Sequence, residues 1–262
     1  MDMRFGRLNY ALRTGPHFGN AALINKVLNP RTASISTWMN DLLGLFIPRR
    51  CSACDDALMH FEDVICLNCL SDLPRTRFHG DPANKVEQLF WGKVQLTAAS
   101  AFLQFSRTGK VQGMLHNLKY HQDKQVGLLL GRLMAEELRG CPRFQDVDTF
   151  LPVPLQPRKE RSRGYNQSRV LVDGMTDVWP LPVAGNDLMR VVRTPSQTKR
   201  GRLDRWMNVK EAFQLPDPQA LANKHVLLVD DVVTTGATIE GCVKALEQVP
   251  GVRISLFTAA CA

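Results

Sequence analysis

Residues 226–238 read Val-Leu-Leu-Val-Asp-Asp-Val-Val-Thr-Thr-Gly-Ala-Thr, and this stretch decides the fold. Its first four residues are apolar without interruption, which predicts a strand at Val226–Val229 that is buried on both faces, as in the centre of a parallel sheet. Two carboxylates, Asp230 and Asp231, follow where this strand is expected to end. Because ligands of open α/β sheets bind beyond the carboxyl ends of the strands, these acids are candidate binding residues.

Small and hydroxylated residues follow the acids and lead into a helical pattern. A glycine-containing loop that opens a helix directs backbone N–H groups at an anion. Ionised carboxylates only accept hydrogen bonds, so an adjacent pair suits the vicinal hydroxyls of a ribose. An ordinary turn that caps the helix explains the threonines but not the paired acids. We therefore expect a ribose 5-phosphate at Asp230, Asp231, Thr234, Thr235, Gly236, Ala237 and Thr238.

The rest of the chain after residue 96 alternates strands with helices. Further strands are expected at 97–105, 148–154, 188–192 and 253–258, and helices at 111–120, at 124–138 and from 168 onward. Alternation of this kind predicts an α/β fold with a parallel sheet and right-handed crossovers.

Charge is unevenly distributed along the 262 residues. The formal net charge is +8, and residues 151–210 hold twelve Lys or Arg against five acids. Such a concentration attracts polyanions, and both pyrophosphate and nucleic acid fit. No apolar run reaches the length of a membrane span and no secretory signal is evident, so we expect a cytoplasmic protein without membrane insertion.

Each basic segment of this region contains an aromatic residue, a combination typical of proteins that bind single-stranded nucleic acid. The alternative is that the two aromatics are partly buried packing residues, which is more common. The nucleic-acid candidates are Arg158, Lys159, Arg161, Arg163, Tyr165 and Trp206.

A loop long enough to act as a lid follows the strand expected at 188–192. It spans Thr194–Asn208 and is polar, basic and marked by Pro195 and Gly201. Its cations can stabilise a pyrophosphate leaving group or merely be solvated. The lid candidates are Lys199, Arg200, Arg202 and Arg205.

Four of the seven cysteines form a C-x2-C-x11-C-x2-C pattern, made of Cys51, Cys54, Cys66 and Cys69. Without a secretory signal, paired Cys-x2-Cys units are metal ligands more often than disulfides. Two such units close a tetrahedron around zinc and leave no open position for catalysis. We therefore predict a structural zinc site; the alternative is a redox dithiol, which would need only two of the thiols.

The acid pair and the following loop resemble the phosphoribosyl pyrophosphate (PRPP) motif of the type I phosphoribosyltransferases. Together with the cysteine pattern, the run Arg163–Gln167 and the loop Arg193–Thr198, in this order, the chain resembles the ComF/GntX family. The resemblance implies that Asp230 and Asp231 hold the ribose diol through Mg²⁺ and that the loop after them holds the 5-phosphate. It also implies pyrophosphate beside Pro154 and Leu155, with Thr194–Asn208 as the lid.

We expect three regions: a largely unassigned leader and a helix at 1–47, a double zinc-ribbon-like module with four cysteines at 48–79, and a phosphoribosyltransferase-like domain at 80–262. The family resemblance covers residues 38–262 and implies nothing for residues 1–37. It implies a role in DNA uptake and natural transformation, through handling of imported single-stranded DNA. A working phosphoribosyltransferase for a nucleobase or small amine is the alternative, although no acceptor pocket or catalytic residue is identified. A third possibility is a PRPP-responsive adaptor for a DNA translocase or another competence protein.

Overall fold

The computed structural model describes residues 49–107, 109–120, 123–184, 188–190 and 213–262. The described elements include two short 3-10 helices, η1 (Phe78–Gly80) and η3 (Pro218–Leu221). The α-helices are α3 (Leu67–Ser71), α4 (Lys85–Gln88), α5 (Lys110–Tyr120), α6 (Lys124–Leu138), α7 (Pro157–Arg163), α8 (Gln167–Thr176) and α10 (Ala237–Leu246). The strands are β1 (Ala98–Gln104), β2 (Thr149–Pro152), β3 (Met189–Arg190), β4 (Phe213–Gln214), β5 (His225–Val233) and β6 (Arg253–Cys261).

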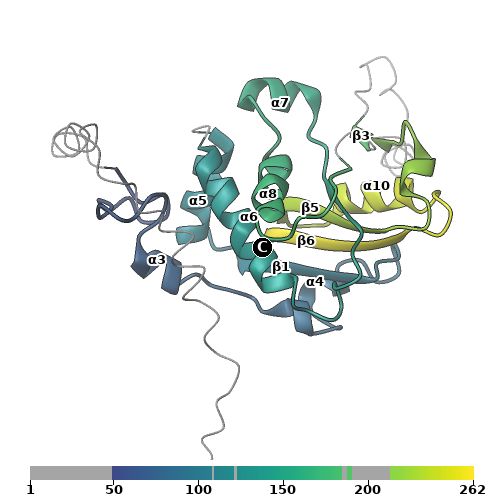
Figure 1. Cartoon of the computed structure of the whole chain (residues 1–262), viewed down its shortest axis with the longest axis horizontal. Helices are drawn as coiled ribbons and strands as arrows, with labels where there is room; N and C mark the ends of the chain where they lie inside the picture. Colours follow the sequence, from purple (N-terminus) through teal and green to yellow (C-terminus); the bar gives the residue numbers. More distant parts are fainter. Residues whose placement is uncertain (1–48, 108, 121–122, 185–187, 191–212) are drawn as a thin grey trace, which may run out of the picture.

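Four strands form one parallel sheet in the order β1-β6-β5-β2, of which Figure 1 labels β1, β6 and β5. β5 lies inside this sheet, and its successive side chains alternate between two apolar clusters. Leu227 and Val229 belong to the cluster on one face, whereas Val226 and Leu228 belong to the cluster on the other. This burial on both faces confirms the predicted central strand.

Helices cover both faces of the sheet, as the predicted fold class requires. α5, α6 and α8 contribute to one apolar cluster, and α4 and α10 contribute to the other. α6 and α8 approach so closely that a Cβ atom on Gly174 would lie 2.3 Å from the Leu128 carbonyl oxygen. The two helices therefore require glycine at their crossing, and this close packing fixes the position of α8.

The four-cysteine segment packs against α5. Ser52 accepts a hydrogen bond at its carbonyl oxygen from the Asn117 side chain at 3.2 Å, and its hydroxyl donates to Asp123 at 3.3 Å. Cys51 and Cys69 belong to the same apolar cluster as α5 and α6. The boundary predicted at residue 79 stays a prediction, and the segment is joined to the sheet by these contacts.

α7 was not expected from the sequence, because its seven residues show no apolar periodicity. Its signals are Pro157 in the first turn, Glu160 near the amino end and Arg161 and Arg163 near the carboxyl end. These residues complement the helix dipole, and Gly164 ends the helix in the left-handed conformation at φ 82°.

The helix that the spacing of apolar residues at 37–46 predicts lies outside the described residues, as do residues 1–47 as a whole. The described helices include none that is both long and apolar enough to cross a membrane.

Candidate functional site at the carboxyl edge of the sheet

The acid pair lies within β5 rather than after it. β5 continues to Val233, paired with Cys261 of β6, so the strand end predicted at Val229 is wrong by four residues. Hydrogen bonding to β6 carries the strand through both acids, which a pattern of apolar residues cannot reveal. Asp230 and Asp231 still lie in its last four residues, at the carboxyl edge of the sheet.

The predicted phosphate loop joins β5 to α10. Thr234, Thr235 and Ala237 are exposed, and Thr238 is partly buried. Gly236 is the N-cap of α10, with φ 77° and no side-chain hydrogen bond to the helix. The first turn of α10 therefore presents backbone N–H groups at this loop, as an anion site requires.

Gly236 is required by both its conformation and its surroundings. Its φ of 77° lies in the left-handed region, which glycine adopts at least cost. A Cβ atom at this position would also lie 2.8 Å from Cε1 of Phe90, which is buried beneath the loop. The ring of Phe90 thus positions the loop from the face covered by α4 and α10.

Asp230 is partly buried and accepts two hydrogen bonds at Oδ1. The hydroxyl of Ser168, in the first turn of α8, donates at 2.9 Å, and the backbone N–H of Asp231 donates at 2.9 Å. Burial, and then the charge of Asp231, raises the pKa of Asp230 to about 7. A cation at this position would favour the ionised form.

Asp231 forms an ion pair with Lys119, whose Nζ lies 2.8 Å from Oδ2. Lys119 is in the last turn of α5, more than a hundred residues earlier in the chain. We did not predict it, since one lysine in an amphipathic helix gives no signal in the sequence. The pair places a cation of the protein next to the proposed ribose site.

Residues 163–168 form hydrogen bonds that hold the start of α8 next to Asp230. Asn166 caps α8 by accepting from the Ser168 N–H at 3.0 Å, and its side chain donates to the Val153 carbonyl at 3.0 Å. Arg163 donates to the side chain of Gln167 at 2.8 Å. This motif therefore orients Ser168 toward Asp230 instead of forming a free basic loop.

Tyr165 is not an exposed stacking residue, and that prediction is wrong. Only 8% of Tyr165 is exposed, its hydroxyl donates to the Leu118 carbonyl, and Lys124 lies over its ring. Tyr165 instead ties the end of α5 to the segment after α7.

The residues expected to face pyrophosphate follow β2. Pro154 and Leu155 are partly buried and lie between β2 and α7. β2 pairs with β5, so both segments leave the sheet at its carboxyl edge. The lid candidates Lys199, Arg200, Arg202 and Arg205, and also Trp206, lie outside the described residues.

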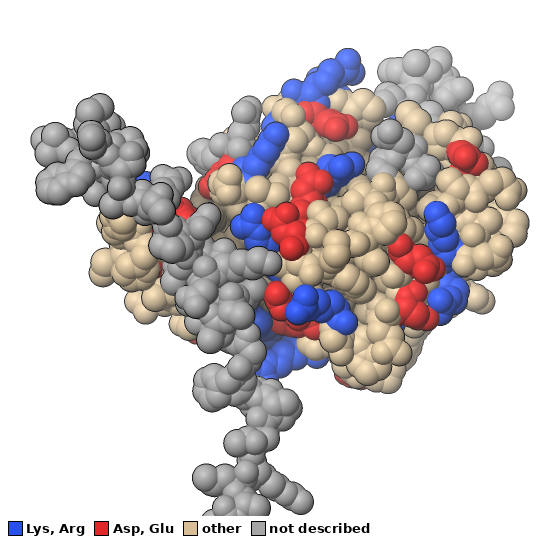
Figure 2. Space-filling view, in the orientation of Figure 1, with Lys and Arg blue, Asp and Glu red and all other residues tan. Residues whose placement is uncertain are grey.

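The remaining nucleic-acid candidates are on α7. Arg158, Lys159 and Arg161 are exposed, and Arg163 is partly buried. Figure 2 shows Lys and Arg side chains at the top of the molecule, where α7 lies in Figure 1. This helix therefore presents a basic surface on the side of the carboxyl edge.

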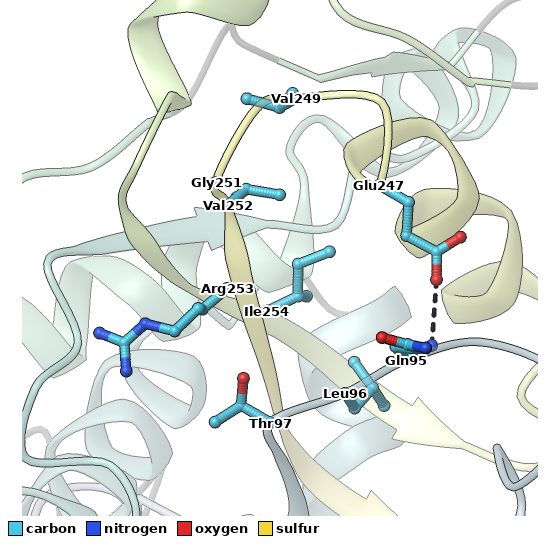
Figure 3. Close-up of a pocket in the computed structure, with 9 residues that line it drawn as sticks. All are labelled: Gln95, Leu96, Thr97, Glu247, Val249, Gly251, Val252, Arg253 and Ile254. Carbon is cyan, nitrogen blue, oxygen red and sulfur yellow. Dashed lines mark hydrogen bonds between the residues drawn. The ribbon is translucent and has the colours of Figure 1, made fainter.

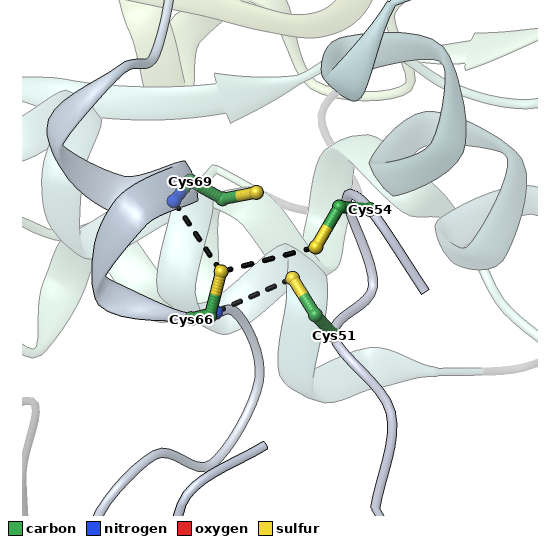
Figure 4. Close-up of side chains that lie close together, drawn as sticks. All are labelled: Cys51, Cys54, Cys66 and Cys69. Atoms are coloured by element: carbon green, nitrogen blue, oxygen red, sulfur yellow. Dashed lines mark hydrogen bonds between the residues drawn. The ribbon is translucent and has the colours of Figure 1, made fainter. Parts of the chain in front are cut away.

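The four predicted zinc ligands converge, with all sulfur atoms within 4.8 Å of one another (Figure 4). The sulfurs of Cys54 and Cys66 lie 3.8 Å apart. Zn–S bonds of about 2.3 Å in a tetrahedron place the sulfurs about 3.8 Å apart, so the cluster can hold a structural zinc.

The thiols also differ in acidity. Burial raises the pKa of Cys69. For Cys51 burial acts in the same direction, but hydrogen bonds from the backbone, first from Cys66, outweigh it and lower the pKa to about 7. A bound cation would compensate thiolates at all four positions.

A cavity of about 480 Å³ lies at the opposite, amino-end edge of the sheet (Figure 3). Its polar contacts are structural: Glu247 accepts from the backbone N–H of Gln95 at 3.0 Å. Near this edge Asp146, His225 and Ser255 are hydrogen-bonded in the order of a hydrolase triad, but Ser255 is completely buried. A hydroxyl that no substrate can reach is not a nucleophile, so this edge is not the candidate site.

Sequence comparison finds bacterial relatives named as competence proteins or DNA utilization proteins, whereas no family model matches. The chain is 27% identical to "Competence protein F" of Haemophilus influenzae, over 76% of this chain and 84% of the relative. It is 23% identical to "Competence protein ComFC" of Streptococcus pneumoniae, over 79% of this chain and 86% of the relative. The match to "DNA utilization protein YhgH" of Salmonella typhimurium is 32% identical but spans only 48% of this chain and 56% of the relative.

Solved structures of several enzymes show partial similarity to the chain. A glutamine PRPP amidotransferase from B. subtilis aligns with a TM-score of 0.38 at 16% identity, over 54% of this chain and 30% of that chain. A hypoxanthine phosphoribosyltransferase from Staphylococcus aureus aligns with a TM-score of 0.32 at 12% identity, over 53% and 74%.

Proposed function

Since this chain is a homologue of the ComF competence proteins, we propose that it binds PRPP with Mg²⁺ at the carboxyl edge of its sheet and handles imported single-stranded DNA during DNA uptake. The observation that carries the proposal is the placement of Asp230 and Asp231 in the last four residues of β5, the strand that leads into the loop opening α10 at Gly236. A cytoplasmic location, where thiols stay reduced, is part of the proposal.

The ribose and the 5-phosphate of PRPP would contact different groups of the protein. Asp230 and Asp231 would hold the ribose diol, with Mg²⁺ between diol and carboxylates, because carboxylate oxygens are suitable Mg²⁺ ligands. The exposed loop at 234–238 and the amino end of α10 would hold the 5-phosphate. Pro154 and Leu155 would flank the pyrophosphate, and the four lid cations remain a prediction from the sequence.

Titration calorimetry of the full chain with PRPP and Mg²⁺ tests the site. We expect saturable binding that the double variant Asp230→Asn, Asp231→Asn weakens at least 100-fold, about 2.7 kcal/mol. Asp173→Asn, which removes an exposed carboxylate of α8 paired with Arg169, is the matched control and should bind as the parent does. Absence of heat with the folded parent protein would contradict the proposal.

The same material distinguishes a binding protein from an enzyme. Under the proposal PRPP is held without turnover. Release of pyrophosphate from PRPP when nucleobases or small amines are added, lost in the double variant, would support the transferase alternative instead. The partner protein, such as a DNA translocase, stays a prediction.

We also propose that the cysteine cluster holds a structural zinc. Four thiolates around one ion would fix the segment that packs on α5. We expect one equivalent of zinc in the purified protein and a fall of several degrees in Tm after chelation, restored by zinc but not by magnesium. Cys141→Ser, at a buried cysteine outside the cluster, is the control that should keep its zinc. Full stability without metal would contradict this role.

A further inference from the structure

A small cavity of about 240 Å³ lies between the end of α5 and α7, and the sequence did not reveal it. Its five lining residues combine three cations, one hydroxyl and one aromatic ring, and none of these five described residues is acidic. The lining residues are Lys119, Tyr120, Lys159, Ser162 and Arg163. Such a set suits a ligand that carries negative charge next to a flat, unsaturated ring.

Tyr120 supplies the ring. It is 63% exposed, although tyrosine usually buries much of its side chain. The Arg163 guanidinium lies 5.6 Å from its centroid, and the His116 ring lies 4.9 Å away. The ring therefore has neighbours that orient it while it remains open to solvent.

The walls of the cavity are tied together. The buried hydroxyl of Tyr165 donates to the carbonyl of Leu118, one residue before Lys119. Arg163 is held by Gln167 at 2.8 Å. These contacts fix the end of α5 against the end of α7, so the cavity is formed before any ligand arrives.

One residue is shared with the proposed PRPP site. Lys119 lines the cavity, and its Nζ forms the 2.8 Å ion pair with Asp231. Its ammonium group cannot be the main partner of Asp231 and of a phosphate in the cavity at the same time.

We propose that this cavity binds one nucleotide unit of single-stranded nucleic acid, with a base stacked on Tyr120 and a phosphate held by Lys159 and Arg163, and that Lys119 couples it to the acid pair. This inference rests on the proposed function and assigns its DNA contact to specific residues. Arg158 and Arg161 are exposed on the same helix as Lys159, and under this proposal they would contact the neighbouring phosphates.

The sign of the coupling follows from the ion pair. Mg²⁺ at Asp231 competes with Lys119 and releases it toward the cavity. A phosphate in the cavity attracts Lys119 and frees Asp231. Either ligand thus breaks the ion pair between Lys119 and Asp231. Once one ligand has broken this pair, the other binds without that cost, so each ligand raises the affinity for the other.

The first experiment measures the affinity for a fluorescent oligo(dT) by anisotropy at fixed low salt. We expect Tyr120→Leu to weaken binding about five- to 100-fold, from the loss of stacking, and Tyr120→Phe to stay within about two-fold. Phe61→Leu, at another exposed aromatic far from α7 in the sequence, is the control and should bind as the parent. An effect of Phe61→Leu equal to that of Tyr120→Leu, or no effect of Tyr120→Leu, would overturn the assignment.

A competition arm separates a strand from a free nucleotide. We expect dTMP to displace the oligonucleotide only at concentrations far above the Kd of the oligonucleotide, because a single nucleotide lacks the adjacent phosphates. Equal affinity for dTMP would show a mononucleotide site and overturn the nucleic-acid assignment.

The second experiment repeats the anisotropy titration with saturating PRPP and Mg²⁺. In the parent protein we expect the oligo(dT) affinity to rise about five-fold or more. Lys119→Ala should bind oligo(dT) more weakly and show the same affinity with and without PRPP. A rise that persists in Lys119→Ala, or none in a parent protein that binds PRPP, would overturn the coupling. A parent protein that does not bind PRPP would refute the proposed function, while the Tyr120 result would still decide the DNA contact.

Discussion

The two ends of β5 carry ionisable groups in opposite situations. At its amino end the completely buried His225 contacts Asp146 at 2.9 Å and Ser255 at 2.8 Å. Arg253, and then His225, lowers the pKa of Asp146. At its carboxyl end, burial and the charge of Asp231 raise the pKa of Asp230 to about 7.

This contrast separates stability from ligand binding along one strand. The amino-end network has partners for both ring nitrogens of His225, and its serine is inaccessible. At the carboxyl end, burial and mutual repulsion of the two carboxylates make it costly to ionise both acids. Among the described residues, Lys119 is their only ion-pair partner. A bound cation and sugar would stabilise the ionised acids, whereas the groups at the amino end are already hydrogen-bonded to one another.

Breaking the amino-end network should have the largest effect on stability. We expect His225→Ala to lower the free energy of unfolding by about 2–4 kcal/mol, because it leaves Ser255 buried without its partner and opens a cavity. Urea denaturation measures the change. PRPP affinity of the folded protein should match that of the parent, and a selective loss of ligand affinity without destabilisation would contradict the comparison.

Ser168→Ala should have the reverse profile. Its hydroxyl favours the ionised form of Asp230, so its removal should raise the pKa of that acid further and weaken binding of PRPP with Mg²⁺ about ten-fold. The stability should change by less than about 1 kcal/mol, since Asp230 can take up a proton. Calorimetry and urea denaturation on the same sample test both parts; Ser71→Ala, on the exposed end of α3, is the control.

The smallest expected effect is a dependence on acid pH at the amino end. The pKa of Asp146 lies below its ordinary value of 3.8 in the folded protein, so its stabilising contribution is present above that pH and is lost as the pH falls through the folded value. Because half of this side chain is exposed, we expect Asp146→Asn to cost at most about 1 kcal/mol at pH 6. The difference from the parent protein should shrink toward pH 3, and a constant difference would contradict the ion pair.

Local patterns in the sequence were enough to predict the sheet, α6 and the cysteine cluster. α6 spans Lys124–Leu138, as predicted, because its apolar residues recur at helical spacing. β5 was identified by its apolar run, and Cys51–Cys69 by the spacing of thiols. Each of these signals lies within about twenty consecutive residues.

The missing parts depend on contacts between distant segments. Lys119 reaches Asp231 only through the packing of α5 against the sheet. The sequence named Tyr165, together with Trp206, as a stacking candidate because each lies in a basic segment. The hydroxyl of Tyr165 is held by the Leu118 carbonyl, whereas the ring of Tyr120 is exposed. A sequence shows which residues are aromatic, but tertiary packing decides which ring faces solvent.

α5 also connects the cysteine segment to the acid pair of β5. Ala53 and Ser52 of the cysteine segment lie against Gly113, where a Cβ atom would be 3.2 Å from their carbonyl oxygens. Lys119 follows six residues later, about 9 Å along the helix axis. One continuous helix thus joins the segment that carries Cys51 and Cys54 to the lysine that pairs with Asp231, so the positions of these two groups depend on the same backbone.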